Sequence, residues 1–545
     1  MTADRRRSLF TLLVFLLAAH ALYAAAWQAG WVRDVTGWLQ SLHTQSFSDY
    51  LLRRGKHVQS LYPFTQWTLW LTYKAFGVSP LAWHLLMVSA HAVVAWGWTR
   101  CGRRLLIDAG IRGAEIIALF GGLFFLLSPY ATEVVVWEAG FHYLQGMLLQ
   151  LGVLYCVLRW IRSGKMSAAW VAALLFVPAV LSLEVFLLTP VYTLLVLVWY
   201  RNFKLLENYR FRLGLVLFLL PQLVLCLLQY VAFRVLYSYS VPHIGALHAS
   251  WIADYVRKPG KYMFHVLLDG RYWPAVIRVG AYRVLNSWPF LVLFYGGGLL
   301  FLVQVWRRWK GLGAVQQAGC FLGLFAAAVL VLMMPMHFHE EGLVYFDRYA
   351  YFLLPPAGML LGLLLYKLPF SRVSMPVVWL TQAALLLGTV LLWRESDAMS
   401  KRMLQSLPEA EVGKTTVLLN VPNAMNGVPM IGATQEGEAA LMLRYVLGHP
   451  YRGRLLEPSA CNLEKTTDDV VIRKTGPATL AVTLPDNEGW WSGGVPTGNW
   501  ENDVFSVKLP NPECCYELDL KKPADSVVLL LWQKDRWDRV ATVKE

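Results

Sequence analysis

The stretch MHFHEEGLVYFDRYAYFLLPP, residues 336–356, places two histidines, two glutamates, an aspartate and an arginine at the start of a long apolar run. A helix needs about 20 apolar residues to cross a bilayer. Ionisable groups at membrane depth are costly and mark functional sites by default. This stretch therefore predicts a membrane-spanning helix whose rim carries chemistry.

The whole chain has the composition of a membrane protein. Of its 545 residues 57% are hydrophobic and only 15% are charged, whereas soluble proteins average about 25% charged residues. This excludes a soluble globular protein and predicts an α-helical polytopic membrane protein. Hydropathy predicts about eleven spans, near 8–28, 81–100, 115–130, 143–161, 167–182, 185–200, 213–236, 289–306, 315–336, 349–367 and 375–393.

Alternate loops between these spans are basic, and by the positive-inside rule they are cytoplasmic. They contain the clusters 5–7, 100–112, 159–165, 201–212, 307–310 and 367–372. The N-terminus is then cytoplasmic, and an odd number of spans places the C-terminus outside the cytoplasm. Because the basic residues are explained by orientation, no nucleic-acid partner is predicted. We expect an integral protein of a bacterial inner membrane, in contact with membrane lipids.

The chain divides into a membrane domain, 1–393, and an extracytoplasmic domain, 394–545. The membrane domain has two long external loops, near 29–80 and 237–288, and the segment 63–77 is predicted to be a surface helix. In the second domain the segments 415–422, 469–485 and 525–533 have the pattern of strands, and 436–448 that of a helix. We therefore expect a small α/β or mostly β domain.

Three cysteines fall in this external domain. If it folds in an oxidising compartment, Cys461 can pair with either Cys514 or Cys515. The chain has no CxxC pair and no zinc-binding spacing.

Scattered ionisable residues share one predicted level, the external face of the membrane. They are Asp34, Lys56, His57, Glu133, Glu138, His142, Glu184, Arg234, Asp347 and Arg348. A carboxylate can take a proton from an attacking hydroxyl, and an arginine can hold a phosphate in bidentate fashion. A sugar carried on a lipid phosphate needs both at this depth.

Each of these residues also has a structural interpretation. Asp34 and Glu133 can cap helices, Glu184 can form a structural ion pair, and Arg234 and Arg348 can anchor spans at the interface. The HFHEE run at 337–341 has the ligand types of a metal site. Its short spacing favours a solvated loop, so no metal ligands are assigned.

Five short patterns, in order, resemble the polytopic GT-C glycosyltransferases, and within them the protein O-mannosyltransferase-like group that includes the transmembrane and TPR-containing mannosyltransferases. They are the acidic residue after the first span (Asp34), YPFTQWTLWLTYKAFGVSPLAWHLLMVSAHAV (62–93), SPYATEVVVWEAGFHYLQG (128–146), LSLEVFLLTP (181–190) and FDRYAYFLLPPAG (346–358). The TPR repeats are absent.

The resemblance implies sugar transfer from a polyprenyl-phosphate-linked donor to an extracytoplasmic acceptor, with inversion at the sugar. Asp34 would be the general base, and Arg348 and Arg234 would hold the lipid phosphate. Three glutamates would shape the sugar site or bind a divalent cation, the one cofactor left open. They are Glu133, Glu138 and Glu184. Lys56, His57, His142 and Tyr349 are further predicted substrate-binding residues.

The sequence departs from the family pattern at four positions. Phe141 and Tyr143 replace an Arg and an Asp, Leu183 replaces a Lys, and Asp347 replaces a Glu. A catalytically inactive GT-C-like assembly protein is therefore one alternative. The other is a transporter or flippase, but transporters bind near the bilayer midplane, and here the ionisable groups gather at one face.

Overall fold

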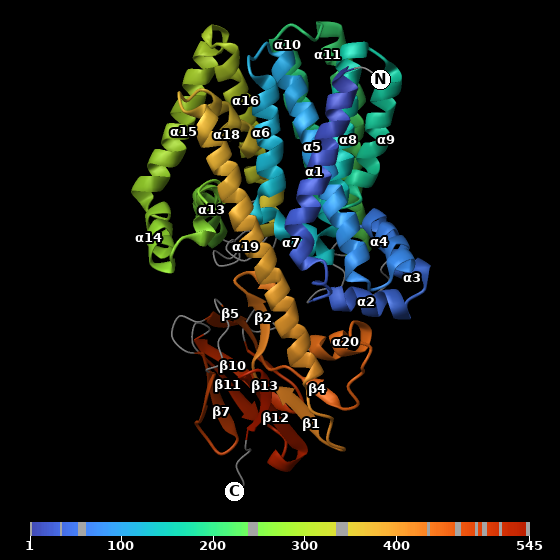
Figure 1. The fold of residues 1–545 in the computed structure, drawn as a ribbon, viewed down its shortest axis with the longest axis vertical. Helices are drawn as coiled ribbons and strands as arrows, with labels where there is room; N and C mark the ends of the chain where they lie inside the picture. The colour runs from blue at the N-terminus through green and yellow to red at the C-terminus, as the bar shows by residue number, and fades with distance from the viewer. Residues whose placement is uncertain are drawn as a thin grey trace.

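A computed structural model describes residues 3–32, 35–52, 62–237, 249–333, 347–432, 437–463, 470–484, 489–492, 499–511 and 515–540. Within these ranges a bundle of long helices stands above a β-rich domain (Figure 1). The bundle helices are α1 (Ala3–Tyr23), α5 (Pro80–Asp108), α6 (Ala114–Leu127), α8 (Phe141–Ser163), α9 (Met166–Val180), α10 (Thr189–Asn202), α12 (Leu220–Tyr237), α15 (Trp288–Arg308), α16 (Ala314–Met333), α18 (Leu354–Tyr366) and α19 (Ser371–Gln405).

The helices match the predicted spans. Among the described residues, seven helical segments are long and apolar enough to cross a membrane. An eighth candidate is the pair α6 and Pro129–Val136, which bends by 56°. Three shorter apolar helices fall on the other predicted spans: α9, α18 and 314–330 of α16. The protein is an integral membrane protein.

Helix ends follow from local sequence. Pro80 occupies the first turn of α5, where its missing N–H is not needed. Gly164 adopts φ +65° directly after α8 and ends it in a left-handed cap. Pro129 follows α6 and begins the 3-10 turn η2 (Pro129–Ala131), which produces the bend before α7 (Thr132–Val136).

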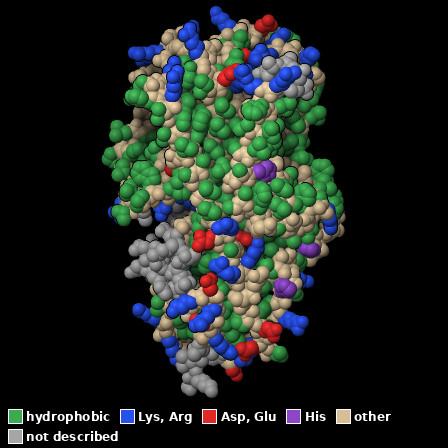
Figure 2. All heavy atoms as spheres, in the orientation of Figure 1, with side chains coloured by type: hydrophobic (Ala, Val, Ile, Leu, Met, Phe, Trp, Pro, Cys, Tyr) green, Lys and Arg blue, Asp and Glu red, His purple; other side chains and the backbone are tan. Residues whose placement is uncertain are grey.

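The basic loops lie together at one end of the bundle, opposite the β-rich domain. Arg7 and Arg103 both pair with Glu115, and Arg104 and Arg162 both approach Asp108. Figure 2 shows the blue side chains along this edge, above a broad hydrophobic band. We call this edge the basic end and the opposite one the domain end.

Further helices and 3-10 turns cover the domain end of the bundle. They are α2 (Val35–Thr44), α3 (Phe47–Leu52), α4 (Pro63–Phe76), η3 (Glu138–Gly140), η4 (Glu184–Leu188), α13 (Ala249–Leu267), η6 (Gly270–Tyr272), α14 (Ala275–Leu285) and η8 (Asp347–Phe352). The predicted helix at 63–77 is confirmed as α4. The predicted loop near 237–288 contains α13 and α14, which lie beside α15 at one flank of the bundle (Figure 1).

Helix α19 connects the two parts of the molecule. It has 35 residues, and at 1.5 Å per residue it is about 50 Å long, whereas the bilayer core is only about 30 Å thick. Its last turns therefore project beyond the bundle into the β-rich domain (Figure 1). The predicted domain boundary at 393/394 lies inside this continuous helix.

The C-terminal domain contains three sheets among the described residues. The first has the order β13-β12-β1-β4, with β1 parallel to both β12 and β4. The others have the orders β6-β7-β11-β10-β9 and β3-β2-β5-β8. The strands are β1 (Thr415–Leu418), β2 (Val421–Met425), β3 (Val428–Pro429), β4 (Arg454–Leu456), β5 (Ala460–Leu463), β6 (Val471–Lys474), β7 (Thr479–Thr483), β8 (Gly489–Ser492), β9 (Trp500–Glu501), β10 (Phe505–Asn511), β11 (Cys515–Leu520), β12 (Val527–Gln533) and β13 (Arg536–Val540).

The predicted α/β or mostly β character of this domain is confirmed. The predicted strand segments contain β1, β6, β7 and β12, and the predicted helix contains α20 (Glu438–Tyr445). Of the two partners left open for Cys461, Cys515 is not bonded to it, because both are free thiols. Cys461 is a buried free thiol on the central strand β5, and its Sγ lies 3.6 Å from the carbonyl oxygen of Val421. Cys514 lies outside the described residues.

Glycines allow α6 and α18 to pack with their backbones in close contact. A Cβ on Gly358 would lie 2.7 Å from Phe124 Cδ1 and 3.1 Å from the carbonyl oxygen of Gly121. A Cβ on Gly362, one turn later, would lie 2.8 Å from Phe120 Cδ1. Small residues four apart are the usual means of close helix approach in membranes, where no hydrophobic effect drives helices together.

We expect Gly358→Leu to separate α6 from α18 and to destabilise the bundle by about 1–3 kcal/mol, the usual cost of overpacking. The measurement is the midpoint of thermal unfolding in detergent. Gly296→Leu on α15 is the matched control, because a Cβ there meets no atom within 4 Å. Equal unfolding midpoints for the two variants would contradict this packing argument.

Candidate functional site

Two consecutive residues of η8 contact opposite sides of the domain end. Asp347 is directed toward α13 and η6, and Arg348 toward α7. Both are within the segment FDRYAYFLLPPAG. The 3-10 turns of η8 separate their side chains, so one short segment joins two parts of the structure.

Arg348 is bound by Glu133. Its Nη1 lies 2.6 Å from Glu133 Oε1, and its backbone N–H donates to Oε2 at 2.8 Å. The Glu133 side chain is 3% exposed and that of Arg348 is 16% exposed. Both carboxylate oxygens therefore accept from one residue, a bidentate arrangement that binds α7 to η8.

Asp347 is bound by Arg271 and His265. Arg271 Nη1 donates to Asp347 Oδ2, and His265 Nε2 lies 3.3 Å from Oδ1. Arg271 Nη2 also donates to the carbonyl oxygen of Asn426, in the turn between β2 and β3. Arg271 therefore links the membrane bundle to the C-terminal domain.

His265 carries no charge in this cluster. Burial, followed by the nearby guanidinium groups of Arg271 and Arg278, lowers the pKa of His265 to about 3. The imidazole is neutral at physiological pH, so the charge of Asp347 is balanced by Arg271.

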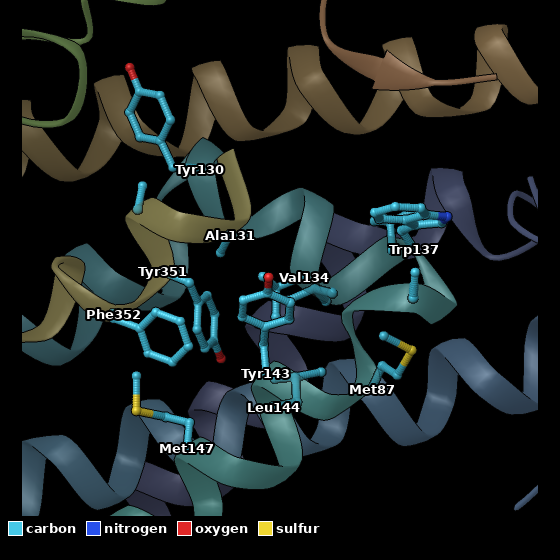
Figure 3. Packing of buried hydrophobic residues seen from close by; sticks show 14 of the residues in the cluster. Met87, Tyr130, Ala131, Val134, Trp137, Tyr143, Leu144, Met147, Tyr351 and Phe352 are labelled. Atoms are coloured by element: carbon cyan, nitrogen blue, oxygen red, sulfur yellow. The ribbon is translucent and has the colours of Figure 1, made fainter. Parts of the chain in front are cut away.

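Aromatic rings surround the Arg348–Glu133 pair. The guanidinium carbon of Arg348 lies 5.4 Å from the ring centre of Trp137 and 5.1 Å from that of Tyr349. The Tyr143 ring lies 6.1 Å from that of Tyr349 and 5.5 Å from that of Phe352. Figure 3 shows the rings of Tyr143, Tyr351 and Phe352 packed side by side. The Glu133 carboxylate is buried beside these rings, and in such low-dielectric surroundings a charge-assisted hydrogen bond is stronger than in water.

A cavity of about 470 Å³ opens on the other side of Arg271. It lies between α19, the η6–α14 segment and the β2–β3 turn. One wall is the helical face of α19, and the other residues are mainly polar. The lining residues are Arg271, Tyr272, Arg278, Ala384, Leu385, Gly388, Thr389, Leu391, Leu392, Glu395 and Asn426.

Two further predicted residues lie where η3 leads into α8. Glu138 is 1% exposed, and its Oε2 accepts the backbone N–H of Trp31 at 2.8 Å. The ring of His142 stacks on Tyr62, 5.7 Å away, and lies 6.2 Å from the ring of Trp38. The structure thus brings Glu133, Arg348 and Tyr349 into one cluster and places Glu138 against the end of the first span.

The remaining predicted site residues are not described at side-chain level. Asp34, Lys56 and His57 lie outside the described residues, as does the HFHEE run. The side chains of Glu184 and Arg234 lie outside them too. Their roles stay predictions. In the described part of the chain, no three His, Cys, Asp or Glu side chains are grouped as metal ligands, so a divalent cation also stays a prediction.

Sequence reasoning missed Arg271 and Arg278. Both lie in a predicted external loop, where the positive-inside rule expects few basic residues. Basic residues on that side are a signal that could have identified them. His265, Asp397 and Lys401 were missed as well, because no motif marks them.

We expect Glu133→Gln to destabilise the protein, because it leaves the partly buried guanidinium of Arg348 without its bound carboxylate. Breaking a buried ion pair costs about 3–5 kcal/mol, whereas replacing both partners is often neutral. Glu133→Gln combined with Arg348→Met should therefore recover much of the lost stability. Thermal unfolding of the three variants in detergent tests this, and a double variant less stable than Glu133→Gln alone would contradict it.

The buried carboxyl group of Asp269 is expected to make the stability of the protein depend on pH. It lies between α13 and η6 at φ +52°, and Gln382 donates to its Oδ2 at 2.8 Å. Burial raises the pKa of Asp269 to about 6, although this hydrogen bond lowers it. The folded state therefore binds the proton more tightly than the unfolded state, and this group lowers stability as pH rises through about 4 to 6.

We expect Asp269→Asn to remove this loss, since Asn also tolerates the left-handed backbone. Its gain in unfolding temperature over wild type should grow from pH 4 to pH 6 and stay constant above about pH 7. Unfolding scans across this pH range provide the measurement. A gain that is independent of pH would show that the Asp269 carboxyl is not the cause.

No protein-family model matches the chain, and a search of curated proteins finds no match. Among solved structures, ArnT from Cupriavidus metallidurans bound to undecaprenyl phosphate is 14% identical, with a TM-score of 0.39 over 84% of this chain and 95% of ArnT. The oligosaccharyltransferase AglB from Archaeoglobus fulgidus, in complex with an inhibitory peptide and a dolichol-phosphate, is 11% identical, with a TM-score of 0.37. The match covers 77% of this chain and 63% of AglB.

The resemblance of the sequence patterns to the GT-C glycosyltransferases stays a prediction. The finer assignment to the O-mannosyltransferase-like group stays a prediction.

Proposed function

We propose that this protein is a membrane glycosyltransferase that moves a sugar from a polyprenyl-phosphate-linked donor to an acceptor. The observation that carries the proposal is the cavity at the domain end, which combines two arginines with an apolar helical wall. A lipid-linked sugar phosphate matches this lining. Its phosphate carries the negative charge that arginines bind, its lipid chain is apolar, and its sugar adds hydroxyls.

The lining residues divide by chemistry in the way such a donor requires. Arg271 and Arg278 would hold the phosphate, because guanidinium groups match phosphate geometry in bidentate fashion. Leu385 and Leu392 of α19 would contact the first part of the lipid chain. Glu395 would accept hydrogen bonds from sugar hydroxyls. A cavity of about 470 Å³ is within the usual range for ligand sites.

The chemistry would be a direct displacement. The acceptor oxygen attacks the anomeric carbon, its proton passes to the Asp34 carboxylate, and the bond from that carbon to the phosphate oxygen breaks. The lipid phosphate leaves with its negative charge, which Arg271 and Arg278 stabilise. Attack opposite the leaving group inverts the anomeric centre. Arg348 and Glu133 would support the sugar site from the adjoining aromatic cluster.

We assign the domain end to the extracytoplasmic side, because the basic loops lie at the opposite end. The proposed setting is a bacterial inner membrane with the N-terminus in the cytoplasm. The C-terminal domain borders the cavity through Asn426, and in this proposal it would present the acceptor to the site.

The test uses purified protein in proteoliposomes with a panel of radiolabelled polyprenyl-phosphate sugars and a crude acceptor extract. We expect transfer by wild type and only a small residual rate by Asp34→Asn. Gly388→Leu should raise the KM for the lipid donor by about tenfold, since Gly388 lines the cavity and has open space around it. A tenfold change corresponds to about 1.4 kcal/mol, within the range of a buried apolar contact.

Gly296→Leu on α15 is again the control, because it adds the same side chain at an open site away from the cavity. Unchanged donor KM in Gly388→Leu would remove the cavity as the donor site. Absence of transfer by folded wild type with every donor would overturn the proposed activity. Movement of the labelled lipid across the bilayer without transfer would identify a flippase instead.

A further inference from the structure

Five consecutive residues at the end of the first span, Gln28–Val32, are held by side chains from other elements. We call this segment the strap. Each of its residues has one backbone polar group bound by a different side chain. The contacts are Lys401 Nζ to Gln28 O (2.8 Å), His84 Nε2 to Ala29 O (2.5 Å), Gly30 N to Asp397 Oδ1 (3.3 Å), Trp31 N to Glu138 Oε2 (2.8 Å) and Trp137 Nε1 to Val32 O (3.0 Å).

The strap has a backbone conformation that needs such support. Gly30 has φ +129°, and Trp31 has φ +58°, which is the left-handed region that bulky residues rarely adopt. The Trp31 side chain is 1% exposed and meets Trp83 edge to face at 5.3 Å. A strained backbone conformation persists only where many surrounding contacts hold it in place. Such conformations are concentrated at functional sites.

Satisfying buried backbone groups explains only part of this arrangement. A neutral amide side chain accepts a hydrogen bond from N–H without the cost of burying a charge. Here two carboxylates converge on the successive N–H groups of Gly30 and Trp31. Glu138 Oε1 is buried with no hydrogen-bond partner, and a Cβ on Gly30 would lie 2.2 Å from it.

The charged groups come from two distant elements. Asp397 and Lys401 are one turn apart on α19, and their side chains pair at 2.7 Å. Glu138 begins η3, next to Trp137, which binds the last residue of the strap. Among the described residues, His84 of α5 is a further ionisable group that contacts the strap. The strap is thereby held against three parts of the bundle at once.

We propose that Glu138, Asp397 and Lys401 are positioning residues for the catalytic base. They hold the strap in its strained form. The position of Val32, the last residue of the strap, then determines where the chain continues toward Asp34, two residues further on. This inference rests on the proposed function. In this proposal Glu138 binds the backbone of the strap instead of the sugar. Because Asp397 and Lys401 belong to α19, this helix also has a role in transfer.

The first measurement is independent of activity. Hydrogen–deuterium exchange is followed on peptides covering the strap in full-length protein in nanodiscs. We expect faster exchange in Asp397→Ala and Glu138→Ala than in wild type. Glu138→Gln should retain slow exchange, because its carbonyl oxygen can still accept the Trp31 N–H. Ser400→Ala is the matched control, since Ser400 is buried on the same helix but bonds only Ser396 O among its described contacts.

The second measurement is steady-state transfer by the same variants. A displacement of about 1 Å at a catalytic group can cost about a hundredfold in rate. We expect Asp397→Ala and Glu138→Ala to lower kcat by about 10- to 100-fold, with the donor KM within about twofold of wild type. Glu138→Gln and Ser400→Ala should retain kcat. In the Asp34→Asn background, Asp397→Ala should cause no further loss of residual activity.

Each outcome has a distinct meaning. Unchanged exchange in both alanine variants would overturn the strap contacts themselves. Faster exchange with unchanged kcat, or a further loss in the Asp34→Asn background, would overturn the positioning role. Loss of kcat in Glu138→Gln with slow exchange would show that the charge of Glu138 acts directly. A wild type that transfers no sugar overturns the proposed function and this role with it, and is recognised because exchange still differs between variants.

Discussion

Burying a charge is costly unless it is paired and hydrogen-bonded, and this requirement organises the domain end of the protein. The short segment η8 supplies Asp347 and Arg348 in succession. Arg348 is neutralised by Glu133 of α7, and Asp347 by Arg271 of η6. Three segments far apart in the chain are therefore joined through two adjacent residues.

Arg271 takes part both in the packing of the domain end and in the proposed binding of the lipid phosphate. The same guanidinium binds Asp347, donates to the Asn426 carbonyl of the C-terminal domain, and lines the cavity. A phosphate entering this cavity would share these donors. Donor binding and the seating of the C-terminal domain would then be coupled through one side chain.

Helix α19 has a similar linking role over a longer distance. Gly388 lies in the cavity wall, Asp397 and Lys401 contact the strap, and the carbonyl oxygen of Met403 accepts from Trp537 of β13 at 2.8 Å. A single rigid helix thus sets the cavity, the strap and the C-terminal domain in a fixed order along its axis. This is why the helix continues far past the length that the bilayer requires.

The sequence by itself determined the elements. Bilayer thickness sets the length of an apolar helix, so the spans could be predicted from hydropathy, and β-branched runs predicted the strands of the tail. The sequence also identified Glu133 and Arg348 as candidate site residues, because ionisable residues at membrane depth are costly and often functional. The tertiary structure alone decided the partners. Gly30 and Asp397 meet across 367 positions of sequence, and an i, i+4 pair such as Asp397 and Lys401 has the pattern of an ordinary solvated helix face. Side-chain contacts over such separations depend on how the helices pack, and no local pattern records that packing.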